Sequence, residues 1–387
     1  MDGVTKEFYR DTWAEIQLDY ITENLQSLRN YLPNTTEIMA VVKANAYGHG
    51  AVEVAKEAIK AGCHFLAVAI LDEALQLRKN EIQTPILVLG ACRPEYAPIA
   101  AENNISLTVF QKEWVEQATS FLGNKTLKIH IKCDTGMGRI GVRDDTELKD
   151  LLNFVQTNKK MKVEGIFTHF ANADSNNMEY FHNQLIKFKH FLQIIEDKPK
   201  WIHASNSAAT LRSKDSLFSL VRFGISMYGL SPSPEITNEL PFPLREAFSL
   251  HSKLIHIKKV EKGESIGYGC TYIAQEDEWI GTIPIGYADG WLRKLQGQEV
   301  IINGRRAPIV GRICMDQCMV KLPEPFPIGT TVTLIGEQMN ERISMDEIAC
   351  KLETINYEIP CMISNRVPRV YKRGSNIVSV ENGLHYR

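Results

Sequence analysis

Residues 38–70 read IMAVVKANAYGHGAVEVAKEAIKAGCHFLAVAI and contain one strand–helix–strand unit. Two short apolar runs rich in β-branched residues, at 38–42 and 65–70, are typical of buried strands. Between them, residues 51–61 space their apolar side chains as one face of a helix does, and Gly62 stands where such a helix would end. A strand followed by a helix and another strand predicts a parallel sheet with helices on its faces.

The same alternation continues on the C-terminal side of this unit. Short apolar runs separated by helix-length stretches begin at Ile38, Phe65, Ile86, Ile105, Leu127, Val163, Trp201 and Val221. Eight such units predict the α/β class and, within it, a (β/α)8 barrel of the TIM type.

The pattern changes near residue 231, where four prolines fall close together at Pro232, Pro234, Pro241 and Pro243. Neither a helix nor an inner strand tolerates that density of proline. Beyond it the chain reads as short strands with turns at Gly and Asn, interrupted by one helix at Ser344–Leu352. We therefore predict a barrel domain of residues 1–240 and a mostly-β domain of residues 241–387.

Composition excludes several classes of protein. The chain has 387 residues and a net charge of −2, so no charge excess attracts nucleic acid or an anionic membrane. No apolar run approaches the roughly 20 residues of a membrane span, and charges near the N-terminus interrupt any signal-peptide core. The eight cysteines lack the tight spacing of a disulfide scaffold. Cys314 and Cys318 form a single C-x3-C motif, and without a second cysteine pair or a nearby pair of histidines it does not indicate a zinc site. We predict a cytoplasmic protein with no metal.

Reactive side chains follow the predicted strands at their carboxyl ends, where parallel barrels carry their active sites. These positions are Lys43, Asp134 to Arg139, His169, Asn206 with Ser207, and Arg222 to Ile225. Lys43 ends an apolar run, and partial burial would lower the pKa of its amine and free it to form an imine. A lysine that extends its amine to solvent from a strand end is the other interpretation.

Barrels commonly hold a phosphate in the loops after strands 7 and 8. Here those loops supply the hydroxyl of Ser207 and the backbone of Gly224, where the missing side chain lets an anion approach. A turn or bulge glycine is the alternative for Gly224.

The motifs together resemble alanine racemase, a barrel-type family that uses pyridoxal 5'-phosphate (PLP). The resemblance runs from WAEI (13–16) to RVPRVY (366–371) and is carried by AVVKANAYGHG (40–50), KCDTGMGRIGV (132–142), THFANAD (168–174), HASNSAAT (203–210), RFGISMYG (222–229), GYGCTY (267–272), IPIGYADGW (283–291), GRICMDQ (311–317) and TINYEIP (354–360). The motifs of the second domain separate racemases from other barrel-type PLP enzymes.

The resemblance implies roles for individual residues. Lys43 is the Schiff-base lysine and the acid/base on one face of the substrate, and Tyr268, from a partner subunit, serves the opposite face. Two groups are needed because a single base would tend to return the proton to the face it left. His169 and Arg222 form a relay toward the pyridine ring. An arginine there cannot accept the ring proton, so the ring remains a weaker electron sink.

The same resemblance assigns the remaining site. Arg139 touches the cofactor's phenolic oxygen and the substrate carboxylate, and a carbamate on Lys132 would supply the negative charge that fixes Arg139. Asp316 orders its loop or is a turn aspartate, and Asn365 replaces an aromatic residue usual in the family, so packing there is expected to differ. The phosphate is held by Tyr47, Ser207, Gly224, Ile225 and Tyr357, and Asn206 also binds the cofactor. The substrate entrance is shaped by Tyr287 and Met315.

The function implied is racemisation of alanine, which supplies D-alanine for cell-wall peptidoglycan, in a homodimer with shared active sites. A racemase of serine or another small amino acid is the closest alternative. A PLP-dependent decarboxylase of the same architecture is disfavoured by Tyr268. A non-catalytic PLP-binding protein, which would resemble the first domain only, is disfavoured by the second domain.

Overall fold

The computed structural model describes residues 8–384, and the chain forms two compact units that interleave along the sequence. One unit contains residues 21–46 and 51–245. The other contains the residues before 21, the short segment Tyr47–Gly50, and the residues from 246 onward. The linear domain bounds at residue 240 stay a prediction.

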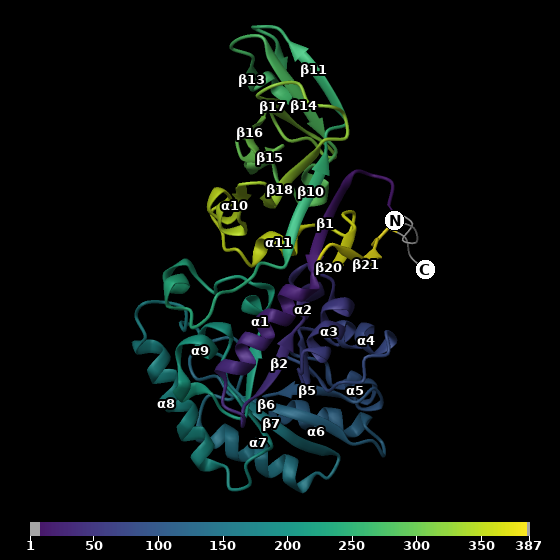
Figure 1. The fold of residues 1–387 in the computed structure, drawn as a ribbon. Coiled ribbons are helices and arrows are strands. Elements are labelled where there is room, and N and C mark those ends of the chain that lie inside the picture. The colour runs from purple at the N-terminus through teal and green to yellow at the C-terminus, as the bar shows by residue number, and fades with distance from the viewer. Residues whose placement is uncertain (1–7, 385–387) are drawn as a thin grey trace. The chain divides into compact units, whose positions relative to one another are not determined.

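The first unit is the predicted barrel (Figure 1). Its eight parallel strands are hydrogen-bonded in the order β8-β7-β6-β5-β4-β3-β2-β9. They are β2 (Glu37–Val41), β3 (Phe65–Val68), β4 (Ile86–Val88), β5 (Ile105–Val109), β6 (Leu127–Lys132), β7 (Met161–Phe167), β8 (Trp201–His203) and β9 (Leu220–Phe223). The two end strands approach through a backbone hydrogen bond of 3.0 Å from Arg222 to Ser205, so the barrel is nearly closed. The α/β barrel prediction is confirmed.

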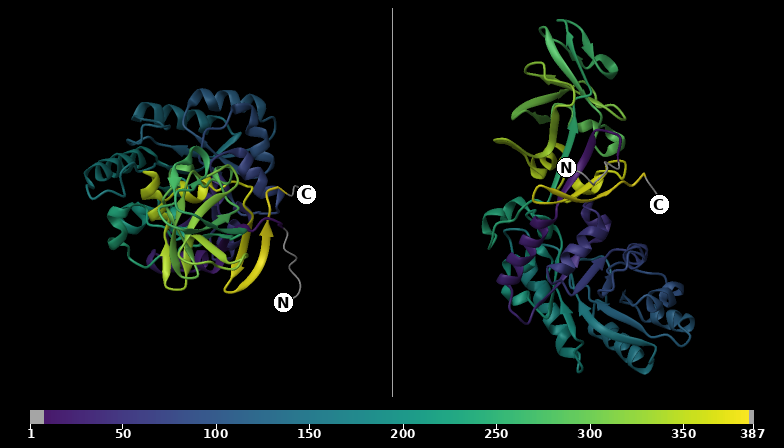
Figure 2. Two further views of the ribbon diagram at one scale, coloured as in Figure 1. Left: turned by 90° about the horizontal axis from the view of Figure 1, so that it is seen from above. Right: turned by 45° about the vertical axis from the view of Figure 1, so that its right-hand side comes forward.

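Helices follow the strands and cover the outside of the barrel (Figures 1 and 2). They are α1 (Leu18–Tyr31), α3 (Ala51–Lys60), α4 (Leu71–Lys79), α5 (Ala97–Glu102), α6 (Lys112–Phe121), α7 (Asp145–Thr157), α8 (Glu179–Ile194) and α9 (Ser207–Arg212), whereas α2 (Lys43–Tyr47) is a short left-handed segment directly after β2. Every residue of β3, β4 and β5 is buried, as expected for strands covered by helices on one face and by the barrel core on the other.

The second unit is mostly β, as predicted. Its large sheet runs β11-β14-β17-β16-β15-β18-β10-β1-β20-β21, and β12 pairs with β13 separately. The strands are β1 (Thr12–Gln17), β10 (Phe248–Lys253), β11 (His256–Val260), β12 (Ser265–Ile266), β13 (Tyr272–Ile273), β14 (Glu278–Ile283), β15 (Glu299–Ile302), β16 (Arg305–Val310), β17 (Cys318–Leu322), β18 (Thr331–Gln338), β19 (Glu341–Ile343), β20 (Arg369–Arg373) and β21 (Asn376–Glu381).

Strand β1 lies between β10, to which it is antiparallel, and β20, to which it is parallel, and Figures 1 and 2 show it beside the yellow C-terminal strands. Helix α10 (Met345–Leu352) begins where predicted, because the Ser344 side chain accepts the N–H of Glu347. Helix α11 (Glu358–Met362) follows it. Within residues 8–384 no helix has the length and apolar character needed to cross a bilayer.

Candidate active site

Lys43 follows β2 and is half-buried. The four residues after it, Ala44–Tyr47, have φ between 52° and 53° and form a left-handed turn. Residues with a Cβ avoid this region at a cost of roughly 1–2 kcal/mol each. The carboxylate of Glu73 accepts the N–H of Ala44 at 2.6 Å, and the side chain of Asn45 accepts a further backbone N–H at 2.8 Å. These bonds hold the strained turn directly after the lysine.

Arg222, on β9, is almost fully buried, and both terminal nitrogens of its guanidinium make hydrogen bonds. Its Nη1 lies 2.8 Å from Nδ1 of His203. Its Nη2 lies 3.1 Å from Nδ1 of His169 and donates to the carbonyls of Thr168 at 3.0 Å and Ala204 at 2.8 Å. The guanidinium therefore has a fixed orientation in the barrel. The prediction missed His203, although its place at the end of a strand followed the same rule that singled out His169.

The pKa of His169 is affected by several positive charges at the carboxyl ends of the barrel strands. Burial lowers its pKa well below the usual value, and so do the charges of Arg222, Lys132, Arg139 and Lys43, in that order of effect. The imidazole is therefore neutral near pH 7. Three of these groups, Arg222, Arg139 and Lys43, are predicted site residues that act on one histidine, and such a cluster of positive charge suits an anionic ligand.

Lys132 ends β6 and is buried, with its amine 3.2 Å from the carbonyl of Cys133 and over the ring of Phe167. Burial and the neighbouring charge of Arg222 lower the pKa of its amine to about 7. A large fraction of this amine is therefore neutral near pH 7 and able to react as a nucleophile.

Arg139 leaves a tight turn that follows β6. Asp134 organises this turn by accepting the N–H groups of Gly136 and Gly138 at 3.0 and 2.9 Å. Burial would raise the pKa of Asp134, but these two bonds, together with the charges of Lys132 and Arg143, lower it instead. The Arg139 side chain is exposed and lines a cavity of about 430 Å³ that also includes Phe110.

The predicted phosphate residues of the barrel lie together after β8 and β9. The Ser207 hydroxyl accepts the N–H of Gly224 at 3.0 Å, which joins the two loops. Asn206 is the N-cap of α9, since its side chain accepts the N–H of Ala209 at 3.0 Å. Ile225, next to Gly224, is buried. The hydroxyl and backbone N–H groups at this point could serve an anion.

In the second unit, Tyr268 lies between the paired strands β12 and β13, and 71% of its surface is exposed. This hairpin is anchored by Tyr272, whose hydroxyl donates to Glu278 at 2.5 Å, while Lys321 pairs with the same carboxylate at 3.1 Å. Burial and the Glu278 charge raise the pKa of Tyr272 to about 12. The hairpin is therefore fixed through Tyr272, while the side chain of Tyr268 remains exposed.

Tyr287 and Met315 lie on two loops that are joined by backbone bonds. The N–H of Tyr287 donates to Cys314 and that of Ala288 donates to Met315, both at 3.0 Å. Only glycine fits at residue 286, since a Cβ there would lie 2.3 Å from the carbonyl oxygen of Cys314. Both predicted entrance side chains are partly exposed. The structure thus brings these two together.

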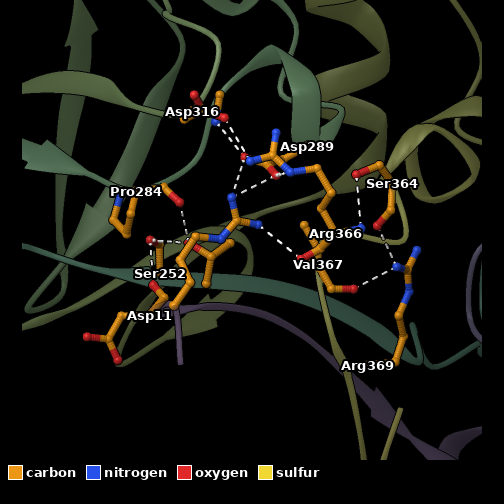
Figure 3. Close-up of polar contacts among 12 residues, drawn as sticks. Asp11, Ser252, Pro284, Asp289, Asp316, Ser364, Arg366, Val367 and Arg369 are labelled. Atoms are coloured by element: carbon orange, nitrogen blue, oxygen red, sulfur yellow. Dashed lines mark hydrogen bonds and ion pairs between the residues drawn. The ribbon is translucent and has the colours of Figure 1, made fainter. Parts of the chain in front are cut away.

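A buried carboxylate holds these two loops to the C-terminal part of the unit. The two oxygens of Asp289 lie 2.8 and 2.9 Å from Nη1 of Arg10, and Figure 3 shows Arg366 placed between Asp289 and Asp316. The Arg366 distances are 3.6 Å to Asp289 and 2.7 Å to Asp316. Asp316 is thus fixed by an ion pair, and the hub residue Asp289 was missed because it appeared only as one letter of a motif.

Tyr47 and Tyr357 meet in the second unit, with ring centroids 6.2 Å apart. The segment that carries Tyr47 is held there because Arg369 donates to the carbonyl of Gly48 at 3.1 Å. Asn365, the departure from the family pattern, packs against Gly383, where a Cβ would lie 2.7 Å from the Asn365 side chain. Among the residues described, no group of three or more His, Cys, Asp or Glu could hold a metal ion.

Comparison with known proteins shows the family to which this chain belongs. Residues 16–232 match the model of the alanine racemase N-terminal domain, and residues 247–371 match that of the C-terminal domain. The chain is 56% identical over 379 residues to alanine racemase of Geobacillus kaustophilus, covering 98% of this chain and 99% of the relative. It is 52% identical over 380 residues to alanine racemase 1 of Bacillus subtilis, with 98% of each covered.

Solved structures show the same likeness. The crystal structure of alanine racemase from Bacillus anthracis with bound L-Ala-P has a TM-score of 0.95 and 52% identity, covering 97% of this chain and 99% of that one. A histidine racemase from Leuconostoc mesenteroides has a TM-score of 0.89 and 33% identity, covering 94% and 98%. The fold therefore occurs in proteins named for different amino acids.

Proposed function

The chain belongs to the alanine racemase family, and from this premise we propose that it interconverts L- and D-alanine with PLP attached to Lys43. The observation that carries the proposal is that the charges of Arg222, Arg139 and Lys43 all act on neutral His169, and Lys43 directly follows β2. A phosphorylated cofactor and an amino-acid carboxylate are both anions, and they would be attracted to the same cluster.

The chain's own residues suit that cofactor. Arg222 offers only donors, so it would face an unprotonated pyridine nitrogen, and its hydrogen bonds keep it in place. We infer that Asn206, Ser207, Gly224 and Ile225 from the barrel hold the phosphate, with Tyr47 and Tyr357 from the second unit. Bound PLP would withdraw electrons from the substrate's α-carbon and make its proton acidic.

Lys43 and Tyr268 would then move the α-proton. Lys43 removes the α-proton of D-alanine and returns it to the same face, and Tyr268 does so for L-alanine. His169 and Arg222 form the relay from the phenol toward the cofactor ring. The exposure of the Tyr268 phenol on a fixed hairpin supports this role, because Tyr268 would have to reach a substrate bound to the barrel of the other subunit. Met315 and Tyr287 border the substrate entrance.

A carbamate on Lys132 is part of the proposal. An amine whose pKa is about 7 is neutral often enough to add carbon dioxide, whereas an ordinary lysine is not. The resulting anion would pair with Arg139 and replace a repulsion by an attraction, which would orient Arg139 toward the cofactor's phenolic oxygen and the substrate.

We further propose a cytoplasmic homodimer whose active sites each combine Lys43 of one subunit with Tyr268 of the other, and whose D-alanine supplies peptidoglycan. Activity toward other amino acids is the second candidate, because a histidine racemase of 33% identity shares this fold. Parallel assays with L-alanine, L-serine and L-histidine would rank these substrates by kcat/KM.

The deciding experiment follows the α-proton in deuterated water. The wild type should wash out the proton of both enantiomers and form D-alanine from L-alanine. Tyr268→Phe should keep washout from D-alanine through Lys43 and lose it from L-alanine. Equal loss from both enantiomers would contradict the two-base mechanism, and reduction with borohydride should place the pyridoxyl group on Lys43 rather than Lys132.

A further inference from the structure

A line of buried side chains leads from Arg222 through the barrel to Glu164 on β7. Nη1 of Arg222 lies 2.8 Å from Nδ1 of His203, and Nε2 of His203 lies 2.9 Å from Nδ1 of His130. Nε2 of His130 then faces Oε2 of Glu164 at 3.6 Å. Both histidine side chains are fully buried, and within residues 8–384 Nε2 of His130 has no hydrogen-bond partner.

The direction of this line follows from the chemistry of its first member. An arginine can only donate, so Nδ1 of His203 must accept. Neutral His203 therefore carries its proton on Nε2 and donates it to Nδ1 of His130, which must accept in turn. Neutral His130 then carries its proton on Nε2, directed at Glu164. Burial lowers the pKa of both imidazoles, so both are neutral near pH 7.

The backbone is built to place Glu164 at the end of this line. In the pairing of β6 with β7, Ile129 is opposite Val163 but His130 is opposite Gly165, so Glu164 is the extra residue of a bulge. A bulge redirects one side chain out of the normal alternation of a strand.

The neighbours of the bulge complete the site. The hydroxyl of Ser106 on β5 donates to Oε2 of Glu164 at 2.9 Å. A Cβ on Gly165 would lie 2.4 Å from Nδ1 of His130, so only glycine leaves room for that imidazole. His203 is stacked on Phe167 at 4.6 Å between centroids, which fixes the second ring.

Glu164 is a carboxylate in this setting. Burial would raise its pKa, but the neighbouring His130 ring, the hydrogen bond from Ser106 and the charge of Lys128 lower it instead. Its side chain is 17% exposed, and Lys128 lies 3.9 Å away on the solvent side. The line therefore ends on a negative charge whose inner oxygen faces an otherwise unpaired N–H.

We propose that Glu164 is a positioning residue for Arg222: its carboxylate, through His130 and His203, fixes both imidazoles as Nε2–H tautomers and so holds the guanidinium in the orientation in which it meets the cofactor ring. The inference rests on the proposed function for its last step only. If His130 carried its proton on Nδ1, His203 would have to donate from its own Nδ1, and two donors would face each other at the 2.8 Å contact with Arg222.

The first test is the tautomeric state of the holoenzyme, read by nuclear magnetic resonance of protein labelled with 15N in histidine. At pH 7 the signals of His130 and His203, assigned by single substitutions, should both be those of the neutral Nε2–H form. An Nδ1–H tautomer or an imidazolium at either residue would overturn the proposal. This arm is independent of catalysis, so it distinguishes failure of this inference from failure of the proposed function.

The second test changes the charge. Glu164→Gln should shift both imidazole signals, shift the absorbance maximum of bound PLP, and lower kcat by about tenfold while KM for alanine changes less than about twofold. Glu164→Asp should recover part of each effect. Ser106→Ala, which removes the support of Oε2, should act in the same direction more weakly and serves if Glu164→Gln does not fold.

Lys128→Gln is the matched control, because it removes the neighbouring ion pair on the solvent side and leaves the histidine line intact. It should reproduce the wild-type spectra and kcat. If Glu164→Gln lowers only the melting temperature, with imidazole signals and cofactor absorbance as in the wild type, Glu164 has a merely structural role and the proposal is wrong.

Discussion

Lys132 is a single buried amine whose charge state should be visible in the stability of the whole barrel. Its pKa falls from the usual 10.5 to about 7 on folding, so the unfolded chain binds more protons between these values. Stability therefore rises with pH across this window, and below pH 7 the full penalty of burying the cation is present. The carbamate proposal gives that penalty a purpose, because only a destabilised ammonium releases a reactive amine near pH 7.

We predict that Lys132→Met stabilises the protein in buffers free of carbon dioxide. The gain in free energy of unfolding should be a few kcal/mol, on the order of the shift in pKa, at pH 6.5, and should nearly vanish at pH 10. Urea unfolding at both pH values measures it. Lys128→Met, at a half-exposed position, is the control and should show no such dependence. An equal gain at both pH values would contradict the buried-cation argument.

The sequence predicts individual site residues when one rule places them. Lys43, Ser207 and Arg222 could be proposed from the sequence because each lies in or follows the carboxyl end of a barrel strand. Glu73 was not found, because its contact with the backbone of Ala44 depends on a left-handed turn. The sequence KANAY contains no glycine that would predict such a turn. His203 and Glu164 act only through partners far along the chain.

At the scale of single elements, the left-handed turn Ala44–Tyr47 carries measurable strain. Ala44 has a φ of 52° and an exposed side chain, so Ala44→Gly loses no packing and relieves the strain. We predict a gain of about 1 kcal/mol in the free energy of unfolding, by calorimetry or urea. Ala101→Gly, in right-handed α5, should lose a similar amount. Destabilisation by both would show that the turn is unstrained.

The loops that carry Tyr287 and Met315 depend on one buried carboxylate. Asp289→Asn keeps the shape of the side chain but leaves Arg10 and Arg366 without their buried partner, so we predict a loss of about 1–3 kcal/mol. KM for alanine should rise more than kcat falls, because the entrance loosens. Asp316→Asn breaks only an exposed ion pair and should cost less than about 1 kcal/mol. The reverse order of the two losses would contradict the role of Asp289.

Elements themselves were predictable where their signal is local. The barrel strands and the capped helix α10 follow from runs of apolar residues and from a capping serine, which act over a few residues. The bulge at Glu164 is different in kind. Whether a residue is extra in a strand depends on the register of the neighbouring strand, which is set by the packing of both against the barrel core.

At the scale of the whole molecule, the cluster of prolines lies where the barrel ends and the mostly-β structure begins. It does not show that the residues before 21 and the segment Tyr47–Gly50 also belong to the second unit. Strand β1 pairs with strands that begin more than two hundred residues later, and Tyr47–Gly50 belongs to the second unit although both its flanks belong to the barrel. Pairing across such separations leaves no local mark in composition. The interleaving also means that Lys43 and Tyr47, four residues apart, belong to different units.

The last prediction concerns the assembly that the proposed function requires. If each active site takes Lys43 from one subunit and Tyr268 from the other, Lys43→Ala and Tyr268→Phe inactivate different halves of the site. Homodimers of either variant then contain no complete site. A heterodimer contains one site with both defects and one site with neither, because the two changes fall on complementary contributions.

Co-expression of the two variants with different affinity tags, followed by sequential purification, isolates the heterodimer. Purified heterodimer should have about half the kcat of the wild type per dimer, and random mixing of equal amounts should recover about one quarter. The control pairs Lys43→Ala with Lys43→Arg, which cannot complement. Purified heterodimers as inactive as the two homodimers would mean that Lys43 and Tyr268 of the same chain form the site, and the shared-site assembly would then have to be abandoned.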